Sequence, residues 1–256
     1  MSAPKPSRSC VVLPSNTKHS NNAAADAGLR YRRTADGRVV IEHDWPHDPR
    51  SCRALQHELA QHIDTRDDFG PVATLGGVDI GFEDNGHVTR AAAVVLDART
   101  LTVIERVLVR VPTRMPYIPG LLSFREIPGA MAALARLETT PDLTLVDGHG
   151  IAHPRRLGVA THLGLVTGLA TIGVAKKRLT GHHDTVPKQR GSWVPLTDGD
   201  DTIGAVLRSR TAVKPIFISA GHRIGLSSAL TWTQAALTRY RLPETTRVAD
   251  RLASNR

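Results

Sequence analysis

Three acidic residues lie where carboxylates could bind a divalent cation. Asp79 interrupts the apolar run "GGVDIGF", Glu126 lies in "SFREIP", and Asp147 ends the apolar run "LTLVD". Burying an unpaired carboxylate is costly, so each acid needs a cation or an open cleft beside it. Mg²⁺ prefers such oxygen ligands and keeps some of its waters. A water on that ion can attack a phosphodiester, so the three acids together indicate phosphoryl hydrolysis.

Each acid also has a purely structural interpretation. Asp79 could form a salt bridge with one of the many arginines. Ser123 and Glu126 have the S-x-x-E spacing of a helix capping box, although Pro128 would then interrupt that helix soon after its start. The residues alone leave both interpretations of Asp79 and Glu126 open. For Asp147 the following "GHG" favours a ligand site, because it removes side-chain bulk at the end of a strand.

Two basic clusters follow apolar runs of the sequence. "AKKRL" places residues 176–178 after "TIGV", and "HPRRLG" places His153, Arg155 and Arg156 after the Asp147 loop. A solvated turn is the ordinary explanation of either cluster alone, but two clusters at matching strand ends favour phosphate binding. The chain has 33 Lys and Arg against 24 Asp and Glu, a net charge of +9. Such a charge is typical of proteins that bind polyanions, nucleic acid above all.

The stretch "RMPYIPGLLSF" predicts a rigid loop with an aromatic tip. Pro116 and Pro119 stiffen the loop, and Tyr117 and Ile118 lie between them. An aromatic tip of this kind could be inserted between bases, where it would replace a displaced nucleotide. The structural alternative is that Tyr117 fixes the loop to the protein core.

Composition argues against several other classes of protein. Cys10 and Cys52 are the only cysteines, so neither a disulfide framework nor a thiolate zinc site is expected. No apolar run approaches the roughly 18 residues of a membrane-spanning helix, and the N-terminus lacks a signal-peptide pattern. No Walker loop, G-x-S-x-G elbow or dinucleotide-binding glycine motif follows a strand. We therefore expect a cytoplasmic protein that does not bind membranes.

The elements that must position these residues alternate between strand and helix. Three strand-like runs joined by short turns predict an antiparallel meander, and the later alternation of helices and strands predicts one mixed α/β sheet with helices on both faces. Residues 1–35 read as a disordered extension and residues 36–256 as one domain. The expected strands cover residues 73–82, 88–98, 101–112, 143–147, 171–175, 202–210 and 215–220, and the expected helices cover residues 48–64, 120–138, a segment after Arg155, and 227–240.

Six motifs in order closely resemble the endonuclease V family of deoxyinosine-specific nucleases, from about residue 70 to 250: "GVDIGFE", "MPYIPGLLSFRE", "VDGHGIAHPRRLG", "TIGVAKKRL", "FISAGHR" and "YRLPETTR". The resemblance implies an RNase H-like fold, in which an antiparallel meander is followed by alternating helices and parallel strands. It also implies cleavage that depends on Mg²⁺, with Mn²⁺ accepted. The expected cut is at the second phosphodiester bond 3′ to hypoxanthine, and it leaves 3′-hydroxyl and 5′-phosphate ends.

The resemblance also implies roles for individual residues. Asp79, Glu126 and Asp147 match the metal ligands of the family. Lys176 matches a lysine near the attacked phosphate, and His222 matches a histidine beside the metal site. The positions expected to contact substrate are Tyr117 and Ile118 in the wedge loop, Gly120, Leu122 and Gly148 around the base, and His153 at the edge of the site.

The expected partner is DNA that contains deoxyinosine, bound by a monomer in a repair reaction. Two alternatives stay open. A related RNase H-like nuclease could act mainly on inosine-containing RNA or on mismatched or branched DNA, because only contacts to the sugars distinguish RNA from DNA. A catalytically silent nucleic-acid-binding module would lack a metal-binding acid, and none of the three acids is missing here.

Overall fold

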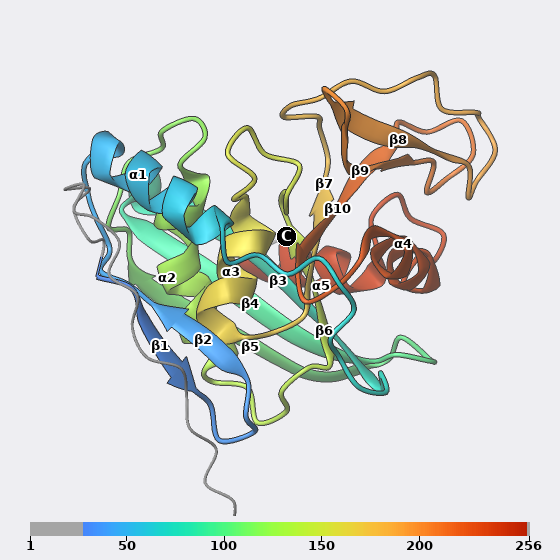
Figure 1. The fold of residues 1–256 in the computed structure, drawn as a ribbon. Helices are drawn as coiled ribbons and strands as arrows, with labels where there is room; N and C mark the ends of the chain where they lie inside the picture. Colours follow the sequence, from blue (N-terminus) through green and yellow to red (C-terminus); the bar gives the residue numbers. More distant parts are fainter. Residues whose placement is uncertain (1–27, 255–256) are drawn as a thin grey trace, which may run out of the picture.

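The computed structural model describes residues 28–254 and contains one eight-stranded sheet flanked by helices (Figure 1). A separate two-stranded hairpin lies near the N-terminus. The strands are β1 (Arg30–Arg33), β2 (Val39–Glu42), β3 (Thr74–Glu83), β4 (Val88–Asp97), β5 (Val103–Pro112), β6 (Leu143–Asp147), β7 (Thr171–Ala175), β8 (Trp193–Asp198), β9 (Asp201–Leu207) and β10 (Ile216–His222). The helices are α1 (Pro49–Ala60), α2 (Leu122–Leu134), α3 (Val159–Thr167), α4 (Leu226–Ala235) and α5 (Glu244–Ala253), with a 3₁₀ turn at Asp84–Gly86.

The sheet is mixed, and this confirms the predicted fold class. Its strand order is β5-β4-β3-β6-β7-β10-β9-β8. β3, β4 and β5 form the predicted antiparallel meander. β3, β6 and β7 are parallel to one another, whereas β10 is antiparallel to β7. The carboxyl ends of β6 and β7 therefore meet at one edge of the sheet, and the carboxyl end of β10 lies at the opposite edge.

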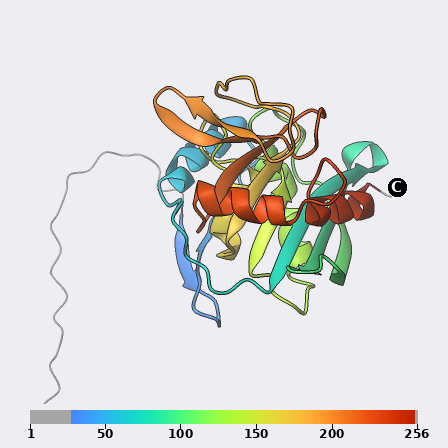
Figure 2. The ribbon, with the colours of Figure 1, turned by 90° about the vertical axis from the view of Figure 1, so that its right-hand side faces the viewer.

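Helices cover both faces of the sheet. On one face, Val78 and Val146 pack against residues of α2 and α3 such as Ile127 and Leu163. On the other face, α5 covers β3 and β4, and α4 covers the region of β6, β7 and β10. Figure 2 shows α4 and α5 across this second face. Because side chains alternate along a strand, neighbouring residues of β3 face different helices.

Two glycines of β3 let α5 approach the sheet unusually closely. A Cβ atom added to Gly81 would lie 2.5 Å from the carbonyl oxygen of Ala253, and one added to Gly77 would collide with that of Thr245. The backbone of α5 therefore rests directly on the strand. Asp79 lies between these glycines and points to the same face, so it comes next to α5.

The N-terminal prediction needs a correction. Residues 1–27 lie outside the described part of the chain, so their predicted disorder stays untested. Arg30–Arg33 form β1 and pair with β2, so the predicted extension to residue 35 is too long. Sequence patterns also missed β8 and α5, which are too short or too polar to stand out. Within residues 28–254, no helix has the length and apolar character needed to cross a bilayer.

Candidate active site

Three aspartates meet at the edge of the sheet where β6 ends. Val78 pairs with Val146 in the parallel register of β3 and β6, so the residues that follow, Asp79 and Asp147, lie side by side. Asp250 projects from α5 toward them. One carboxylate oxygen from each aspartate lies within 4.8 Å of the other two. The structure therefore brings together two of the predicted acids and adds Asp250, which the sequence analysis had not identified.

Glu126 lies close to this group but outside its tight centre. It is 8% exposed and sits in the first turns of α2. Burial raises its pKa well above the ordinary value, and the charges of Asp79 and Asp147 raise it further. The capping-box interpretation is wrong, because α2 begins at Leu122 with no side-chain cap. The Glu126 side chain therefore lies toward the other acids and does not cap the helix.

These half-buried carboxylates destabilise one another's charge. Burial, and next the charge of Asp147, raise the pKa of Asp79 to about 8. Burial also raises the pKa of Asp147, although the Lys176 ammonium opposes the shift. A group of acids in this state needs positive charge to remain ionised near neutral pH. This requirement fits a divalent metal ion, and the all-oxygen donor set fits Mg²⁺ or Mn²⁺.

Lys176 supplies positive charge within the group. It directly follows β7, whose Val174 pairs with Asp147. Its Nζ lies 2.5 Å from Oδ2 of Asp147 and 3.2 Å from Oδ1 of Asp250. Burial alone would lower the pKa of the ammonium, but the neighbouring carboxylates outweigh burial and raise it. Lys176 therefore remains a cation beside the aspartates, and its role near the attacked phosphate stays a prediction.

A cavity of about 140 Å³ lies next to the acids and contains most of the predicted substrate positions. Ile118 is the exception, because it packs into the core cluster around Leu55, Leu59 and Leu121. Tyr117 is 65% exposed at the tip of its loop. The cavity is lined by Gln56, Tyr117, Gly120, Leu122, Ser123, Gly148, His149, His153, Leu157, Gly158, Val159 and Leu179.

A hydrogen-bonded frame holds the wall of this cavity. Gly120 has φ +78°, a conformation that favours glycine, and its carbonyl accepts hydrogen bonds from Gln56 Nε2 at 3.0 Å and Arg155 Nη2 at 2.8 Å. Arg156 forms an ion pair with Asp198 at 2.8 Å. Both arginines therefore bind protein groups, and their interpretation as free phosphate ligands is not supported. Gln56 was missed because its place on α1 resembles an ordinary helix position.

A buried chain of hydrogen bonds ends at Ser123 in the cavity wall. His43 Nδ1 lies 2.8 Å from the carbonyl of Asp44, His43 Nε2 lies 2.8 Å from His162 Nε2, and His162 Nδ1 lies 3.0 Å from Ser123 Oγ. A carbonyl only accepts, so His43 Nδ1 carries the proton. Burial lowers the pKa values of both histidines, which are therefore neutral. It follows that His162 donates to His43 and that Ser123 donates to His162.

The prediction that His222 lies beside the metal site is wrong. His222 pairs with Thr171 at the start of β7, whereas Asp147 pairs with Val174 near its end. Because β10 runs antiparallel to β7, its last residue lies at the far edge of the sheet. The "AGHR" motif marks the end of a strand, but it does not show in which direction that strand runs and therefore at which edge of the sheet His222 lies. Asp250 was also missed, although Pro243 and Glu244 are a recognisable helix start and could have indicated the helix that carries it.

With this geometry established, known proteins provide an independent comparison. A sequence profile of the family described as Endonuclease V matches residues 57–251. The Endonuclease V of Azotobacter vinelandii is 57% identical over 213 residues, which cover 83% of this chain and 96% of that protein. The chain belongs to the endonuclease V family. This membership confirms the recognition made from the six motifs. As its name says, the family is one of nucleases.

Solved endonuclease V structures share the fold. The Streptomyces avermitilis protein is 45% identical, with a TM-score of 0.78 over 82% of this chain and 93% of that chain. The Ciona intestinalis protein is 26% identical, with a TM-score of 0.70 over 80% of this chain and 95% of that chain. That endonuclease V was solved in complex with a 23mer DNA containing an inosine followed by a ribo-adenosine.

Proposed function

We propose that this protein is a DNA repair endonuclease that recognises deoxyinosine and hydrolyses the second phosphodiester bond 3′ to it, leaving 3′-hydroxyl and 5′-phosphate ends. One observation carries the proposal: the half-buried group of Asp79, Asp147 and Asp250 directly adjoins the cavity, because Gly148 both follows Asp147 and lines that cavity. Membership of the family supports it, as does the inosine-containing DNA bound to the Ciona relative. We propose that it acts as a monomer on DNA in the cytoplasm.

The acids would hold Mg²⁺, with Mn²⁺ as an accepted substitute. Asp79, Asp147 and Asp250 have the tight geometry for this, and Glu126 completes the negative surroundings. When bound, the ion would activate a water and offset the charge that develops on the phosphate. Lys176 would then turn from the carboxylates toward the phosphate, which it can reach as a flexible point charge.

The cavity would receive the hypoxanthine base. Among the described residues, no side chain caps the start of α2, so the first N–H groups, those of Leu122 and Ser123, are available as donors. His153 lines the same cavity; its Nδ1 accepts a hydrogen bond from the N–H of Arg155 at 3.2 Å, so its proton lies on Nε2, which faces the Gly120 backbone. The two backbone N–H groups match the carbonyl oxygen of hypoxanthine. Tyr117 would fill the gap left by the displaced base.

One observation favours a second substrate class. The nucleotide after the inosine in the Ciona complex is a ribo-adenosine. An active site that accommodates a 2′-hydroxyl there could act on inosine-containing RNA, and that substrate, together with mismatched or branched DNA, remains the alternative to deoxyinosine DNA.

Nicking of end-labelled substrates tests the proposal. The panel contains a duplex with one deoxyinosine, the unmodified duplex, a mismatched duplex and an inosine RNA, each with Mg²⁺ or with EDTA. We expect a single Mg²⁺-dependent cut one nucleotide beyond the lesion. Asp147→Asn and Asp250→Asn should abolish the cut, whereas Asp200→Asn, in the exposed turn between β8 and β9, should leave it unchanged.

Three outcomes would contradict the proposal. Deoxyinosine DNA that is bound but never cut with Mg²⁺ or Mn²⁺ would identify a binding module. Cleavage of the RNA alone would support the proposed active site but would identify inosine-containing RNA, and not DNA, as the substrate. A fully active Asp250→Asn variant would remove that residue from the metal site.

A further inference from the structure

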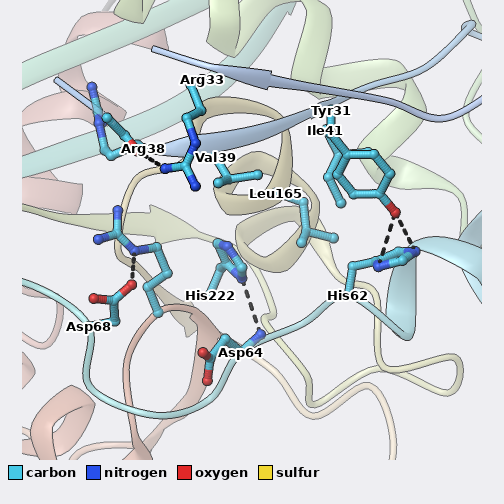
Figure 3. Close-up of a pocket in the computed structure, with 12 residues that line it drawn as sticks. Tyr31, Arg33, Arg38, Val39, Ile41, His62, Asp64, Asp68, Leu165 and His222 are labelled. Carbon is cyan, nitrogen blue, oxygen red and sulfur yellow. Dashed lines mark hydrogen bonds and ion pairs between the residues drawn. The ribbon is translucent and has the colours of Figure 1, made fainter. Parts of the chain in front are cut away.

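A second hollow of about 450 Å³ lies at the opposite edge of the sheet from the candidate active site (Figure 3). It is enclosed by the hairpin β1–β2, the segment after α1, helix α3 and the end of β10. Its volume is within the usual range for small-molecule sites, about 300–1,000 Å³. The lining residues are Tyr31, Arg33, Gly37, Arg38, Val39, Ile41, His62, Asp64, Asp68, Leu165, His222 and Arg223.

His222 presents a hydrogen-bond donor to this hollow. Its side chain is about nine-tenths buried, with 9% of the residue exposed. The backbone N–H of Asp64 donates to its Nδ1 at 3.3 Å. An N–H group only donates, so Nδ1 is unprotonated and the ring proton lies on Nε2. Within residues 28–254, Nε2 has no hydrogen-bond partner, and Figure 3 shows the ring at the centre of the hollow.

Arg33 adds a positive charge without a counter-ion. Its side chain donates to the carbonyl of Gly37 at 3.0 Å, inside its own hairpin. Among the residues that the structure describes, no carboxylate lies within 4.0 Å of its guanidinium nitrogens. Arg33 and Tyr31 alternate onto the same face of β1, and this face lines the hollow. The strand thus supplies a cation and an aromatic ring to the same hollow (Figure 3).

The acidic residues of the hollow are already engaged. Both oxygens of Asp64 accept hydrogen bonds from Arg66, at 2.9 and 2.8 Å. Asp68 accepts one from Nε of Arg223 at 2.9 Å. Arg33, which has no carboxylate partner among the described residues, and the Nε2–H of His222 are both donors, so this part of the hollow favours an anionic group such as phosphate.

The rest of the lining is apolar and partly exposed. Tyr31 is 59% exposed and Val39 is 45% exposed, while Ile41 and Leu165 form part of the floor. An exposed aromatic ring offers a stacking surface for another flat ring. From these features we propose that this hollow binds a phosphomonoester that carries a flat ring. Its phosphate contacts Arg33 and the Nε2–H of His222, and its ring lies on Tyr31. The ligand is either a free nucleoside monophosphate or the 5′-phosphorylated end of a nucleic-acid strand.

This site is separate from the proposed nuclease function. The hairpin that supplies Arg33 and Tyr31 lies before the residues 57–251 that match the family. The aspartate group lies at the other edge of the sheet. Each site can therefore fail in an experiment without affecting the other.

Calorimetric titration of the full chain in EDTA tests the site, because chelation removes metal-dependent phosphate binding at the acids. The probes are deoxyadenosine monophosphate, deoxyadenosine, inorganic phosphate and a 5′-phosphorylated trinucleotide. We expect the monophosphate to bind more tightly than either of its parts. Arg33→Gln should weaken its binding about tenfold, the loss of one charge-assisted contact. Arg32→Gln is the matched control, because Arg32 faces the other side of β1 and pairs with Glu42 at 2.5 Å.

The same variants separate this proposal from the nuclease. Arg33→Gln should cut deoxyinosine DNA at the wild-type rate. Equal affinities for the trinucleotide and the mononucleotide would identify a strand end as the ligand, and preference for the mononucleotide would identify a free nucleotide. Monophosphate binding weaker than about 1 mM, or binding unchanged by Arg33→Gln, would overturn the proposal. A shift of the His222 ring signals in NMR on adding the monophosphate gives a second readout that needs no variant.

Discussion

At the scale of residues, the candidate active site gathers more negative charge than a folded protein favours. Asp79, Glu126 and Asp147 all have raised pKa values in which burial is the largest cause. Such electrostatic destabilisation is common in functional sites, where stability is given up for activity. Lys176 offsets part of it through contacts with Asp147 and Asp250. Removing one acid should therefore stabilise the metal-free protein while abolishing its activity.

The pH dependence of this effect follows from the pKa of Asp79. That pKa is about 8 in the folded protein against 3.8 for an ordinary aspartate. Between these values the folded state binds more protons than the unfolded state, so this carboxyl lowers stability progressively as pH rises. We expect Asp79→Asn to raise the melting temperature in EDTA, by an increment that grows from pH 5 to pH 8. About 1 kcal/mol corresponds to about 2–4 °C for a domain of this size.

Mg²⁺ provides the control for that measurement. The ion should stabilise the wild type more at pH 8 than at pH 5, because it competes with protons for the carboxylates. It should leave Asp79→Asn nearly unchanged. A melting-temperature increment that shrinks with rising pH would show that Asp79 is not held in its protonated form.

Residue types alone revealed much of this site but not all of it. Asp79, Asp147 and Lys176 were recognisable because each stands in or just after an apolar run, and the structure brings the three together. Asp250 was missed because it lies on a polar helix, where an aspartate is unremarkable. His222 was misplaced because a motif gives no information about strand direction. Local patterns identify unusual residues, but only the topology decides which of them meet.

At the scale of elements, the close packing of α5 on β3 determines where Asp250 lies. Gly77 and Gly81 remove the side chains that would separate helix from strand. The buried residues of α5 include Thr245, Ala249 and Ala253, all small. Glycines in a strand and small residues in a helix therefore form one complementary contact. In sequence they are far apart, which explains why the contact could not be predicted.

Gly81→Ala should disturb this contact. The new Cβ would lie 2.5 Å from the carbonyl oxygen of Ala253, so α5 must move away from β3. Overpacking of this kind costs about 1–3 kcal/mol. We expect lower stability in urea and weaker Mg²⁺ binding, because Asp250 moves with the helix. Gly70→Ala is the control, since its Cβ would meet open space. Unchanged Mg²⁺ affinity in a destabilised Gly81→Ala protein would show that Asp250 is not a ligand.

The histidine chain joins three elements that no sequence pattern connects. His43 follows β2, His162 lies in α3, and Ser123 lies in α2. Trp45 stacks on the ring of His162 with an interplanar angle of 20°. The chain therefore fixes the start of α2, and with it one wall of the base cavity, against the N-terminal segment.

His162→Leu tests the strength of this connection. The substitution removes the partners of His43 and Ser123, and each buried polar group left unpaired costs about 1–3 kcal/mol. We expect a loss of stability of that order in urea denaturation. His57→Leu, on an exposed position of α1, should have no such effect. Wild-type stability of His162→Leu would mean that water replaces the lost contacts.

At the scale of the whole molecule, the net charge of +9 predicts strongly salt-dependent binding to DNA. Each phosphate contact contributes a slope of about −0.9 to the logarithm of the association constant against the logarithm of salt concentration. Lys177 and Arg178 are exposed beside the candidate active site. Replacing both with Gln should reduce the slope by about 2, if each neutralises one phosphate.

Fluorescence anisotropy of a labelled duplex between low and moderate salt measures this slope. Arg32→Gln serves as control, because Arg32 is paired with Glu42 on the hairpin. A slope that is identical in the double variant and the wild type would place the DNA elsewhere on the surface.

The order of the acids along the chain has a consequence for biosynthesis. Asp79, Glu126 and Asp147 are translated long before Asp250, which arrives with α5 near residue 250. On the proposed function, a nascent chain that has not yet released α5 holds an incomplete set of ligands. A product of premature termination before residue 244 has the same defect. On that proposal, the nuclease would therefore become active only after α5 has been made and packed on the sheet.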